Sequence, residues 1–178
     1  MHIRLMRESD YPEVVRIYEQ GIKTENATFR TEALPYEEWT RHHHEHSRLV
    51  AIEGEQLLGW VALSPFSSIP AYAGVAEISL YIAEEARGKG VGTRLMEDVI
   101  ESSEAAGIWT LQSQVFPENQ ASLRLHERFG FREVGRRERI GRLGGRWRER
   151  WCSSDAAHIF KIRQVDAMFP CLLCVESK

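Results

Sequence analysis

Residues 76–100 constrain the fold more than any other part of the chain, because a strand pattern passes there through a glycine-rich turn into a helix pattern. At 76–82, apolar and polar side chains alternate, which is the period of a strand with two different faces. At 95–100 the apolar side chains follow the helical period instead. The glycines between them allow the backbone to approach a ligand closely, and the N-terminus of a helix offers free N–H groups. The segment therefore predicts a turn that binds a phosphate or pyrophosphate group.

The turn does not have the form of the common nucleotide-binding motifs. It lacks the Lys-Ser/Thr ending of a P-loop, and its glycines do not have the Gly-x-Gly-x-x-Gly spacing of a dinucleotide-binding fold. Its residues instead match Arg/Gln-x-x-Gly-x-Gly/Ala, as Arg87-Gly88-Lys89-Gly90-Val91-Gly92, and here the chain resembles the GNAT superfamily of N-acetyltransferases. The resemblance implies that this turn and Thr93 hold the pyrophosphate of acetyl-CoA. The glycines alone would also fit a strand–helix turn without a ligand.

A second motif follows at residues 119–131. The segment predicts a helix that Asn119 caps and that ends at Gly130, since glycine suits the positive φ of a helix C-terminus. It is similar to the second signature of the same superfamily, Asn-x-x-Ser/Ala-x-x-Leu-Tyr/His-x-x-x-Gly-Phe. The resemblance implies that Asn119 hydrogen-bonds the pantetheine arm of acetyl-CoA and that His126 lies near its sulfur.

Three further segments narrow the resemblance. Residues 72–77, 116–119 and 141–148 look like the phosphinothricin and arsinothricin N-acetyltransferases, which acetylate the α-amino group of small glutamate-like toxins. The similarity spans residues 1–150. It implies an enzyme of antibiotic resistance and detoxification that acts on phosphinothricin, arsinothricin or methionine sulfoximine. It also implies acetyl-CoA as co-substrate, no metal, and a homodimer.

Two titratable side chains are candidates for the catalysis. The acceptor amine is mostly protonated at neutral pH, so a base is useful, directly or through a water. Glu77 is the only carboxylate inside the strand at 76–82, and the family places its base there. His126 is the candidate that protonates the leaving thiolate or serves as a second base. The ordinary alternatives are a solvent-facing glutamate on a half-exposed strand and a histidine on a helix surface.

Backbone groups and an acceptor pocket complete the expected site. The N–H groups around Leu80, Tyr81 and Ile82 are expected to hold the pantetheine and to polarise the acetyl carbonyl, without a covalent intermediate. Many relatives have an arginine where this chain has Ile69, so Arg30 is the nearest candidate to bind the carboxylate of the acceptor, which leaves the particular amino acid open. The pocket residues expected from the resemblance are Phe29, Arg30, Tyr72 and Val75.

The rest of the chain predicts one α+β domain with a mixed, splayed sheet of six to seven strands flanked by helices. With 178 residues, 43% of them apolar and 28% charged, the chain is long enough to bury a full core. A net charge of −3 gives no reason to expect nucleic-acid binding. Because no signal peptide or membrane-length apolar run is found, the expected location is the cytoplasm. Strands are predicted at 3–5, 109–115 and 131–140, a hairpin at 49–63, and helices at 9–22 and from residue 35.

The histidine and cysteine clusters do not predict a metal-binding site. The run at 42–46 is predicted to be a polar helix face, although His42 and His46 would share one side of that helix, because no second cluster supplies further ligands. Cys171 and Cys174 give equally weak evidence for a zinc site or a redox-active pair. The expected division is an N-acetyltransferase domain at 1–150 and an atypical tail at 151–178, which contains all three cysteines. We hypothesise that this tail is a frameshifted or otherwise replaced last strand.

Three classes of function stay open at this point. The favoured one is an acetyl-CoA-dependent N-acetyltransferase for a small amino-acid-like acceptor. A peptide or protein N-acetyltransferase of the same fold would need an open acceptor groove. A non-catalytic acyl-CoA sensor would not depend on Glu77 or His126.

Overall fold

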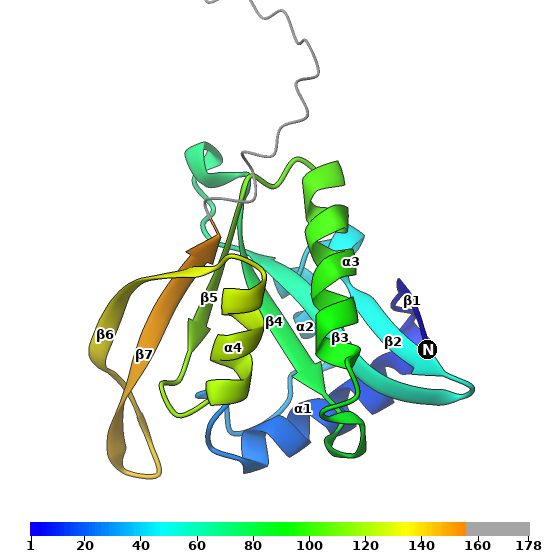
Figure 1. Cartoon of the computed structure of the whole chain (residues 1–178), viewed down its shortest axis with the longest axis horizontal. Coiled ribbons are helices and arrows are strands. Elements are labelled where there is room, and N and C mark those ends of the chain that lie inside the picture. The colour runs from blue at the N-terminus through cyan, green and yellow to red at the C-terminus, as the bar shows by residue number, and fades with distance from the viewer. Residues whose placement is uncertain (156–178) are drawn as a thin grey trace, which may run out of the picture.

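The computed structural model describes residues 1–155, which form one mixed seven-stranded sheet with helices on both faces (Figure 1). The strands are β1 (His2–Leu5), β2 (Leu49–Glu53), β3 (Gln56–Pro65), β4 (Val75–Ile82), β5 (Thr110–Val115), β6 (Arg132–Leu143) and β7 (Arg146–Asp155). The helices are α1 (Tyr11–Lys23), α2 (Tyr36–His42), α3 (Val91–Ala105) and α4 (Gln120–Arg128). The predicted α+β class with six to seven strands is confirmed.

The sheet opens between its two central strands. Its order is β1-β2-β3-β4-β5-β7-β6, and β4 and β5 are its parallel pair. Their register covers only 75–77 against 110–112, after which the strands diverge (Figure 1). The edge of β4 from Ile78 to Ile82 therefore receives no ladder partner from β5. A split of this kind leaves backbone N–H and C=O groups available to a ligand.

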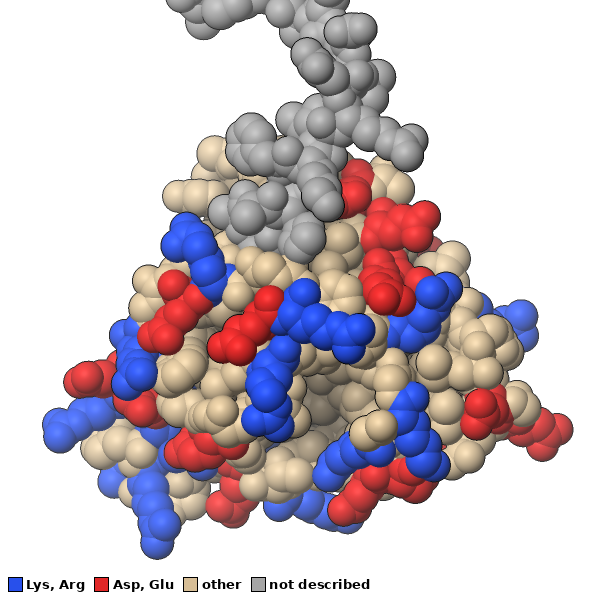
Figure 2. All heavy atoms as spheres, viewed as in Figure 1, with Lys and Arg blue, Asp and Glu red and all other residues tan. Residues whose placement is uncertain are grey.

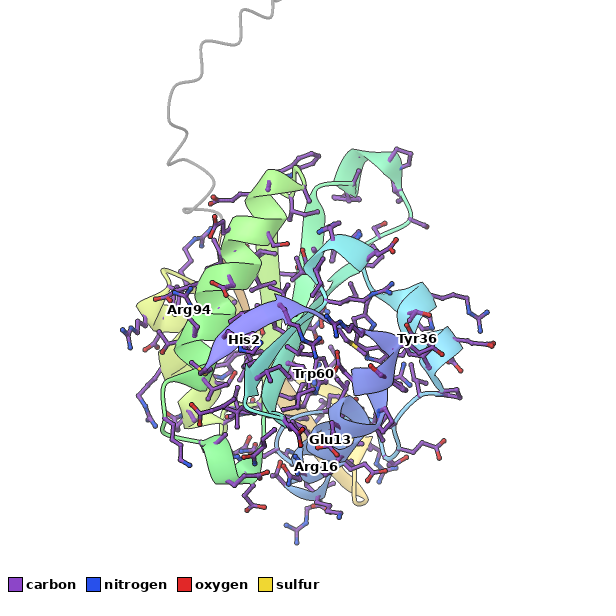
Figure 3. All side chains as sticks on the ribbon, turned by 90° about the vertical axis from the view of Figure 1, so that its right-hand side faces the viewer. His2, Glu13, Arg16, Tyr36, Trp60 and Arg94 are labelled. Carbon is purple, nitrogen blue, oxygen red and sulfur yellow. The ribbon has the colours of Figure 1, made fainter. Side chains whose placement is uncertain are left out.

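Burial explains why the central strands carry long apolar runs. Residues 57–63 of β3 are all buried, because helices cover this strand on both faces. Figure 3 shows α3, with Arg94, on one side of the sheet and α2, with Tyr36, on the other. The buried apolar side chains of α3 recur at helical spacing toward the sheet, and they are Val91, Leu95, Met96 and Val99.

The last described strand crosses the expected domain boundary. β7 runs from Arg146 to Asp155 and pairs with β5 on one side and β6 on the other. Residues 151–155 are thus part of the same sheet as the preceding chain, so a division after residue 150 cuts a paired strand. Cys171 and Cys174 lie outside the described residues, and the hypothesis of a replaced terminus stays a prediction.

The histidine run does not form a continuous helix face, which corrects that prediction. α2 ends at His42, and His43 has an extended backbone with φ −124° and ψ 146°. Arg48 ends the helix, because its Nη2 donates hydrogen bonds of 2.6 Å to the carbonyl oxygens of Thr40 and His43. The His43 ring stacks on Trp39 at 4.2 Å, and its Nδ1 donates to the Trp39 carbonyl at 2.7 Å. His42 and His46 consequently do not share a helix face.

Two negative findings apply to residues 1–155. No helix of this part is long and apolar enough to cross a membrane. Within the same range, no three or more His, Cys, Asp and Glu side chains are grouped so that they could hold a metal ion.

Candidate active site

A cavity of about 1090 Å³ fills the split in the sheet and continues to the start of α3. Its walls come mainly from β4, the first residues of α3, one side of α4, the end of β5, α2 and the loop that follows α1. The surface is hollowed beside α4, and basic side chains stand at the rim (Figure 2). A volume at the upper end of the usual range for ligand sites suits a long ligand together with a small one.

The glycine-rich turn forms the cavity wall at the N-terminus of α3. Gly88 and Gly90 have φ of 74° and 81°, and no atom lies within 4 Å of where their Cβ atoms would be. Glycine is therefore required there by backbone conformation rather than by crowding in the protein itself. The first hydrogen bond of α3 runs from the Arg94 N–H to the Gly90 carbonyl at 3.1 Å, so the amides of 91–93 are left for a ligand.

The remaining residues of the turn differ in their surroundings. A Cβ on Gly92 would lie 3.3 Å from Leu125 Cδ2, so this glycine allows α3 to approach α4 closely. Arg87 lines the cavity and forms a 3.9 Å ion pair with Glu84, whereas Lys89 is exposed and does not line it. The other turn residues that line the cavity are Gly88, Gly90, Val91, Gly92 and Thr93.

The divergent end of β4 forms the floor of the cavity. Leu80, Tyr81 and Ile82 all line it. The Tyr81 ring stacks on Trp60 at 4.8 Å and meets the edge of Tyr18 at 4.9 Å. Burial raises the pKa of the Tyr81 phenol, so its hydroxyl stays protonated at physiological pH. This aromatic stack packs on β4 where the sheet opens.

Glu77 lies at the point where β4 and β5 part. It pairs with Gln112 in the last step of the parallel register, and it lines the cavity. Its Oε2 accepts hydrogen bonds from the side-chain amides of Gln112 at 3.3 Å and Gln114 at 3.1 Å. The side chain is half-buried, so its role as a base stays a prediction beside the alternative of an ordinary glutamate on a half-exposed strand. Two amide donors orient a carboxylate that has further lone pairs available.

His126 lies on the buried side of α4 and also lines the cavity. Only 4% of the residue is exposed, so the alternative of a histidine on a helix surface is wrong. Its Nδ1 donates to the Ser122 carbonyl at 2.7 Å, because a carbonyl oxygen can only accept. The buried Nε2 has no hydrogen-bond partner among the described residues. Burial lowers the pKa of His126, so at neutral pH the ring is neutral and Nε2 is a proton acceptor.

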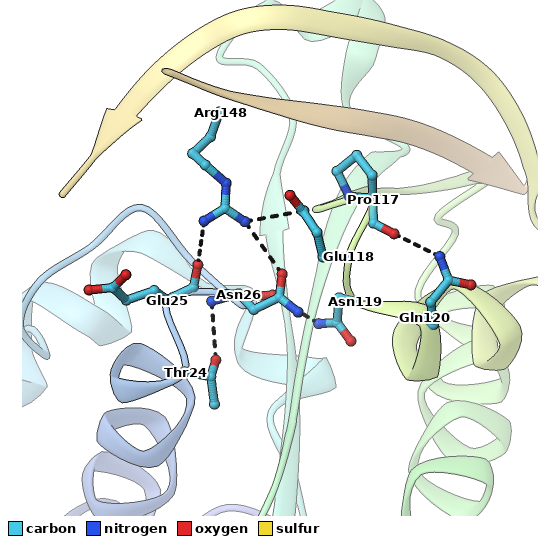
Figure 4. A network of polar contacts seen from close by, with 8 residues as sticks. All are labelled: Thr24, Glu25, Asn26, Pro117, Glu118, Asn119, Gln120 and Arg148. Atoms are coloured by element: carbon cyan, nitrogen blue, oxygen red, sulfur yellow. Dashed lines mark hydrogen bonds and ion pairs between the residues drawn. The ribbon is translucent and has the colours of Figure 1, made fainter. Parts of the chain in front are cut away.

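Asn119 caps α4, as predicted, and is already bound to the protein on both sides of its amide. Its Oδ1 accepts a 3.2 Å hydrogen bond from the Ser122 N–H, and its Nδ2 donates to the Asn26 carbonyl at 3.1 Å. Arg148 extends this contact, since it donates to the Glu25 carbonyl at 2.9 Å and pairs with Glu118 at 3.1 Å (Figure 4). The network joins β7 to the loops that follow α1 and β5.

Three expected pocket residues lie beside the cavity rather than on its wall. Phe29 packs edge-on against Phe116 at 4.9 Å. Tyr72 contacts Phe66 at 5.5 Å, and both are exposed. Val75 pairs with Thr110 of β5, before the split, and it does not line the cavity. Phe29, Tyr72 and Val75 do not line this cavity, whereas Arg30 lines it as an exposed side chain, and contact of any of the four with the acceptor stays a prediction.

Arg150 is a cavity residue that the sequence reasoning missed. It lies in β7, and its guanidinium carbon is 5.0 Å from the Phe29 ring and 4.9 Å from the Phe116 ring. Burial lowers the pKa of Arg150, although the charge of Glu77 acts in the opposite direction. The sequence feature that could have identified it is the alternation at 146–151, where every second residue is an arginine. This spacing places three cations on one face of a strand.

Comparisons with known proteins agree with this geometry. The acetyltransferase (GNAT) family matches residues 11–131. Phosphinothricin N-acetyltransferase of Streptomyces coelicolor is 33% identical over 153 residues, which cover 81% of this chain and 90% of that protein. The crystal structure of ribosomal-protein-alanine N-acetyltransferase from Brucella melitensis has a TM-score of 0.80 at 27% identity, covering 87% of this chain and 99% of that one. A Sinorhizobium meliloti phosphinothricin acetyltransferase in complex with acetyl-CoA has the same fold, with a TM-score of 0.77 at 23% identity and 86% of each chain covered.

Proposed function

The chain belongs to the GNAT family of acetyltransferases, and we propose that it moves the acetyl group of acetyl-CoA to the α-amino group of a small amino-acid-like acceptor of the phosphinothricin type. The observation that carries the proposal is that Glu77 faces the same cavity that begins at the glycine-rich turn. A base and a phosphate-binding turn then serve one continuous site. The 33% identity to a phosphinothricin N-acetyltransferase supports this class of acceptor.

The turn and the free edge of β4 fit acetyl-CoA in separate ways. Residues 87–93 offer backbone amides and two positive-φ glycines to a pyrophosphate, at the positive end of α3. The edge of β4 around Leu80 and Ile82 offers main-chain groups to the amides of a pantetheine arm and an N–H to a thioester oxygen. Asn119 has one amide hydrogen left for the same arm, since its other polar groups are bound within the protein.

Glu77 is proposed as the base. The acceptor arrives as an ammonium ion, and its nitrogen can attack the thioester carbon only after losing a proton. Glu77 accepts that proton, directly or through a water, while Gln112 and Gln114 fix the carboxylate. A bond from nitrogen to the carbonyl carbon forms, the carbon–sulfur bond breaks, and CoA leaves as a thiolate.

His126 is proposed as the second proton-transfer group. Because its Nδ1 hydrogen is bound to Ser122, only Nε2 is able to exchange a proton. The lowered pKa makes it an acceptor first, so it protonates the thiolate only after taking a proton from the reacting amine or from water. This order favours the role of second base over that of a resting acid.

The proposal extends to the assembly and its place in the cell. Three large apolar side chains on the β6–β7 hairpin are exposed, and they are Val134, Ile140 and Trp147. Exposed apolar side chains on one hairpin support self-association, so we propose that the protein is a homodimer. We also propose that it acts in the cytoplasm. Its activity there would confer resistance to phosphinothricin, arsinothricin or methionine sulfoximine. Sedimentation equilibrium tests the dimer, and a monomer at micromolar concentration would contradict it.

A thiol-release assay with acetyl-CoA tests the function. Phosphinothricin and methionine sulfoximine should release free CoA with the wild-type protein, and Glu77→Gln should abolish most of that release. Release with peptides but with no amino acid would favour a peptide N-acetyltransferase, the activity named for the Brucella neighbour. Binding of acetyl-CoA without release to any acceptor would favour a sensor.

A further inference from the structure

We propose that Arg150 is the residue that binds the α-carboxylate of the acceptor. The inference rests on the proposed function and deepens it, because it restricts the acceptor to molecules that carry a carboxylate beside the reacting amine. Arg30, the arginine expected for this role, lines only the exposed part of the cavity. Position 69 does not line it at all, and Ile69 is 56% exposed.

The strand register brings Arg150 to the face of the sheet that carries Glu77. Trp151 of β7 lies opposite Val115 of β5, so Arg150 lies across from Phe116. Residues two apart on a strand share a face, and Gln114, two residues before Phe116, holds the Glu77 carboxylate. The proposed base on β4 and the guanidinium on β7 therefore line the same cavity from one face of the sheet, with β5 between their strands.

Arg150 is a cation without a carboxylate partner among the described residues. None of the ion pairs or side-chain hydrogen bonds found in residues 1–155 includes its guanidinium, and its Nε is buried and unsatisfied there. Arg148, two residues earlier on the same face, is instead paired with Glu118. A charge that is half-buried without a partner is costly, and the guanidinium cannot lose its proton at physiological pH. A bound carboxylate would remove that cost.

The aromatic neighbours of Arg150 prepare it for this role. The rings of Phe29 and Phe116 lie about equally far from the guanidinium carbon and hold the group by cation–π contact. A guanidinium fixed in this way presents parallel N–H groups that match the two oxygens of a carboxylate. Phe29 thus belongs to the acceptor site indirectly, as a positioning residue for Arg150.

The acceptor chemistry follows from the two groups. An α-amino acid carries its ammonium and its carboxylate on one carbon, so it can contact Glu77 and Arg150 together. A peptide N-terminus has an amide in place of the carboxylate and offers Arg150 only a weak, uncharged acceptor. Arg150 is therefore expected to select free amino acids over peptide amines.

The experiment compares one acceptor with and without its carboxylate. KM is measured for phosphinothricin and for its α-carboxamide, with wild type, Arg150→Met, Arg150→Lys and Arg30→Met, which tests the other candidate arginine of the cavity. Arg150→Met should raise KM for phosphinothricin about 30-fold or more, as for loss of a charged hydrogen bond, and change KM for the carboxamide less than about 3-fold. Arg150→Lys should lie between, and acetyl-CoA KM should not change. Equal effects on both acceptors, or a loss confined to Arg30→Met, would overturn the inference.

A binding measurement separates this inference from the proposed function. If the wild-type protein acetylates no amino acid, the proposed function fails, and calorimetric binding of phosphinothricin to the CoA-loaded protein still tests Arg150. Binding that is lost in Arg150→Met and partly kept in Arg150→Lys supports the assignment. Undiminished binding in Arg150→Met overturns it. Thermal melting of each variant shows whether the fold is retained, and Arg150→Lys keeps the long side chain and its charge if the methionine variant does not fold.

Discussion

Asn119 donates a 3.1 Å hydrogen bond to the main-chain carbonyl of Asn26, although 93 positions separate the two residues in the chain. The contact joins the N-cap of α4 to the loop that follows α1. Arg148 reinforces it from β7 by donating to the carbonyl of Glu25 and the side chain of Asn26. Three distant segments are thereby fixed around one end of the cavity.

The first prediction follows from this contact. Asn119→Ala removes both the N-cap bond to Ser122 and the bond to Asn26, so the free energy of unfolding should fall by about 1–2 kcal/mol. Urea unfolding measures this change. Gln120→Ala is the matched control, because it removes one exposed hydrogen bond to Pro117 and should cost less than about 0.5 kcal/mol. Equal stabilities of the two variants would mean that the Asn119 contacts contribute nothing.

The second prediction concerns the glycine-rich turn. Gly90→Val forces a β-branched residue into a φ of 81° and crowds the place where a pyrophosphate would lie. CoA affinity, measured by calorimetry, should fall about tenfold or more. Gly54→Val is the matched control, because Gly54 has a φ of 61° in the β2–β3 turn and does not line the cavity. Gly54→Val should lose about as much stability as Gly90→Val and keep its CoA affinity. Unchanged CoA affinity in Gly90→Val would show that the turn is not part of the coenzyme site.

The third prediction concerns the proposed base. Glu77→Gln keeps the shape of the side chain and an oxygen for Gln112 and Gln114, so the fold and CoA binding should be retained. The turnover number near neutral pH should fall by about 10²-fold or more. Glu104 is an exposed carboxylate on α3, so Glu104→Gln serves as the control and should retain wild-type turnover. Full activity of Glu77→Gln at all pH values would show that the amine loses its proton to solvent.

The fourth prediction is a pH dependence of stability. Burial under Trp39 lowers the pKa of His43 from 6.5 to about 4, so the unfolded chain binds a proton there more readily than the folded chain. The stabilising effect of neutral His43 is complete above pH 6.5 and is lost as the pH falls from 6.5 toward 4, by roughly 2–3 kcal/mol. Burial lowers the pKa of His44, His46 and His126 as well, so all four histidines act in the same direction.

Replacement of one histidine isolates its share of this effect. Chemical unfolding of wild type and His43→Gln is measured between pH 8 and pH 4, with each protein referred to its own stability at pH 8. The variant should lose stability less steeply below pH 6.5, because glutamine does not take up a proton. Parallel curves would show that His43 is not titrated on unfolding.

Local patterns in the sequence predicted the parts of the site that depend on neighbours in the chain. The strand at 76–82, the turn after it and the helix that follows are β4, the glycine turn and α3, because alternation and glycine spacing are local properties. Asn119 was likewise identified as an N-cap. A sheet of six to seven strands was predicted from the order of the elements, and the GNAT family from the motifs together, and both predictions are confirmed.

Long-range contacts decided what the sequence could not show. α2 ends at His42 because Arg48 binds its last carbonyl groups. Arg150 reaches the cavity only because β7 pairs with β5 in one particular register, and no local pattern specifies that register.

The position of β7 between β5 and β6 has a consequence for synthesis on the ribosome. A nascent chain released as far as residue 145 already contains the glycine turn, Glu77 and Asn119, but β6 has no strand to pair with, since β7 is its sole neighbour in the described sheet. The pairing that completes the sheet is also the event that delivers Arg150 to the cavity. If Arg150 has the proposed role, a chain terminated at residue 145 contains the glycine turn and Glu77 but not the arginine that would bind the acceptor.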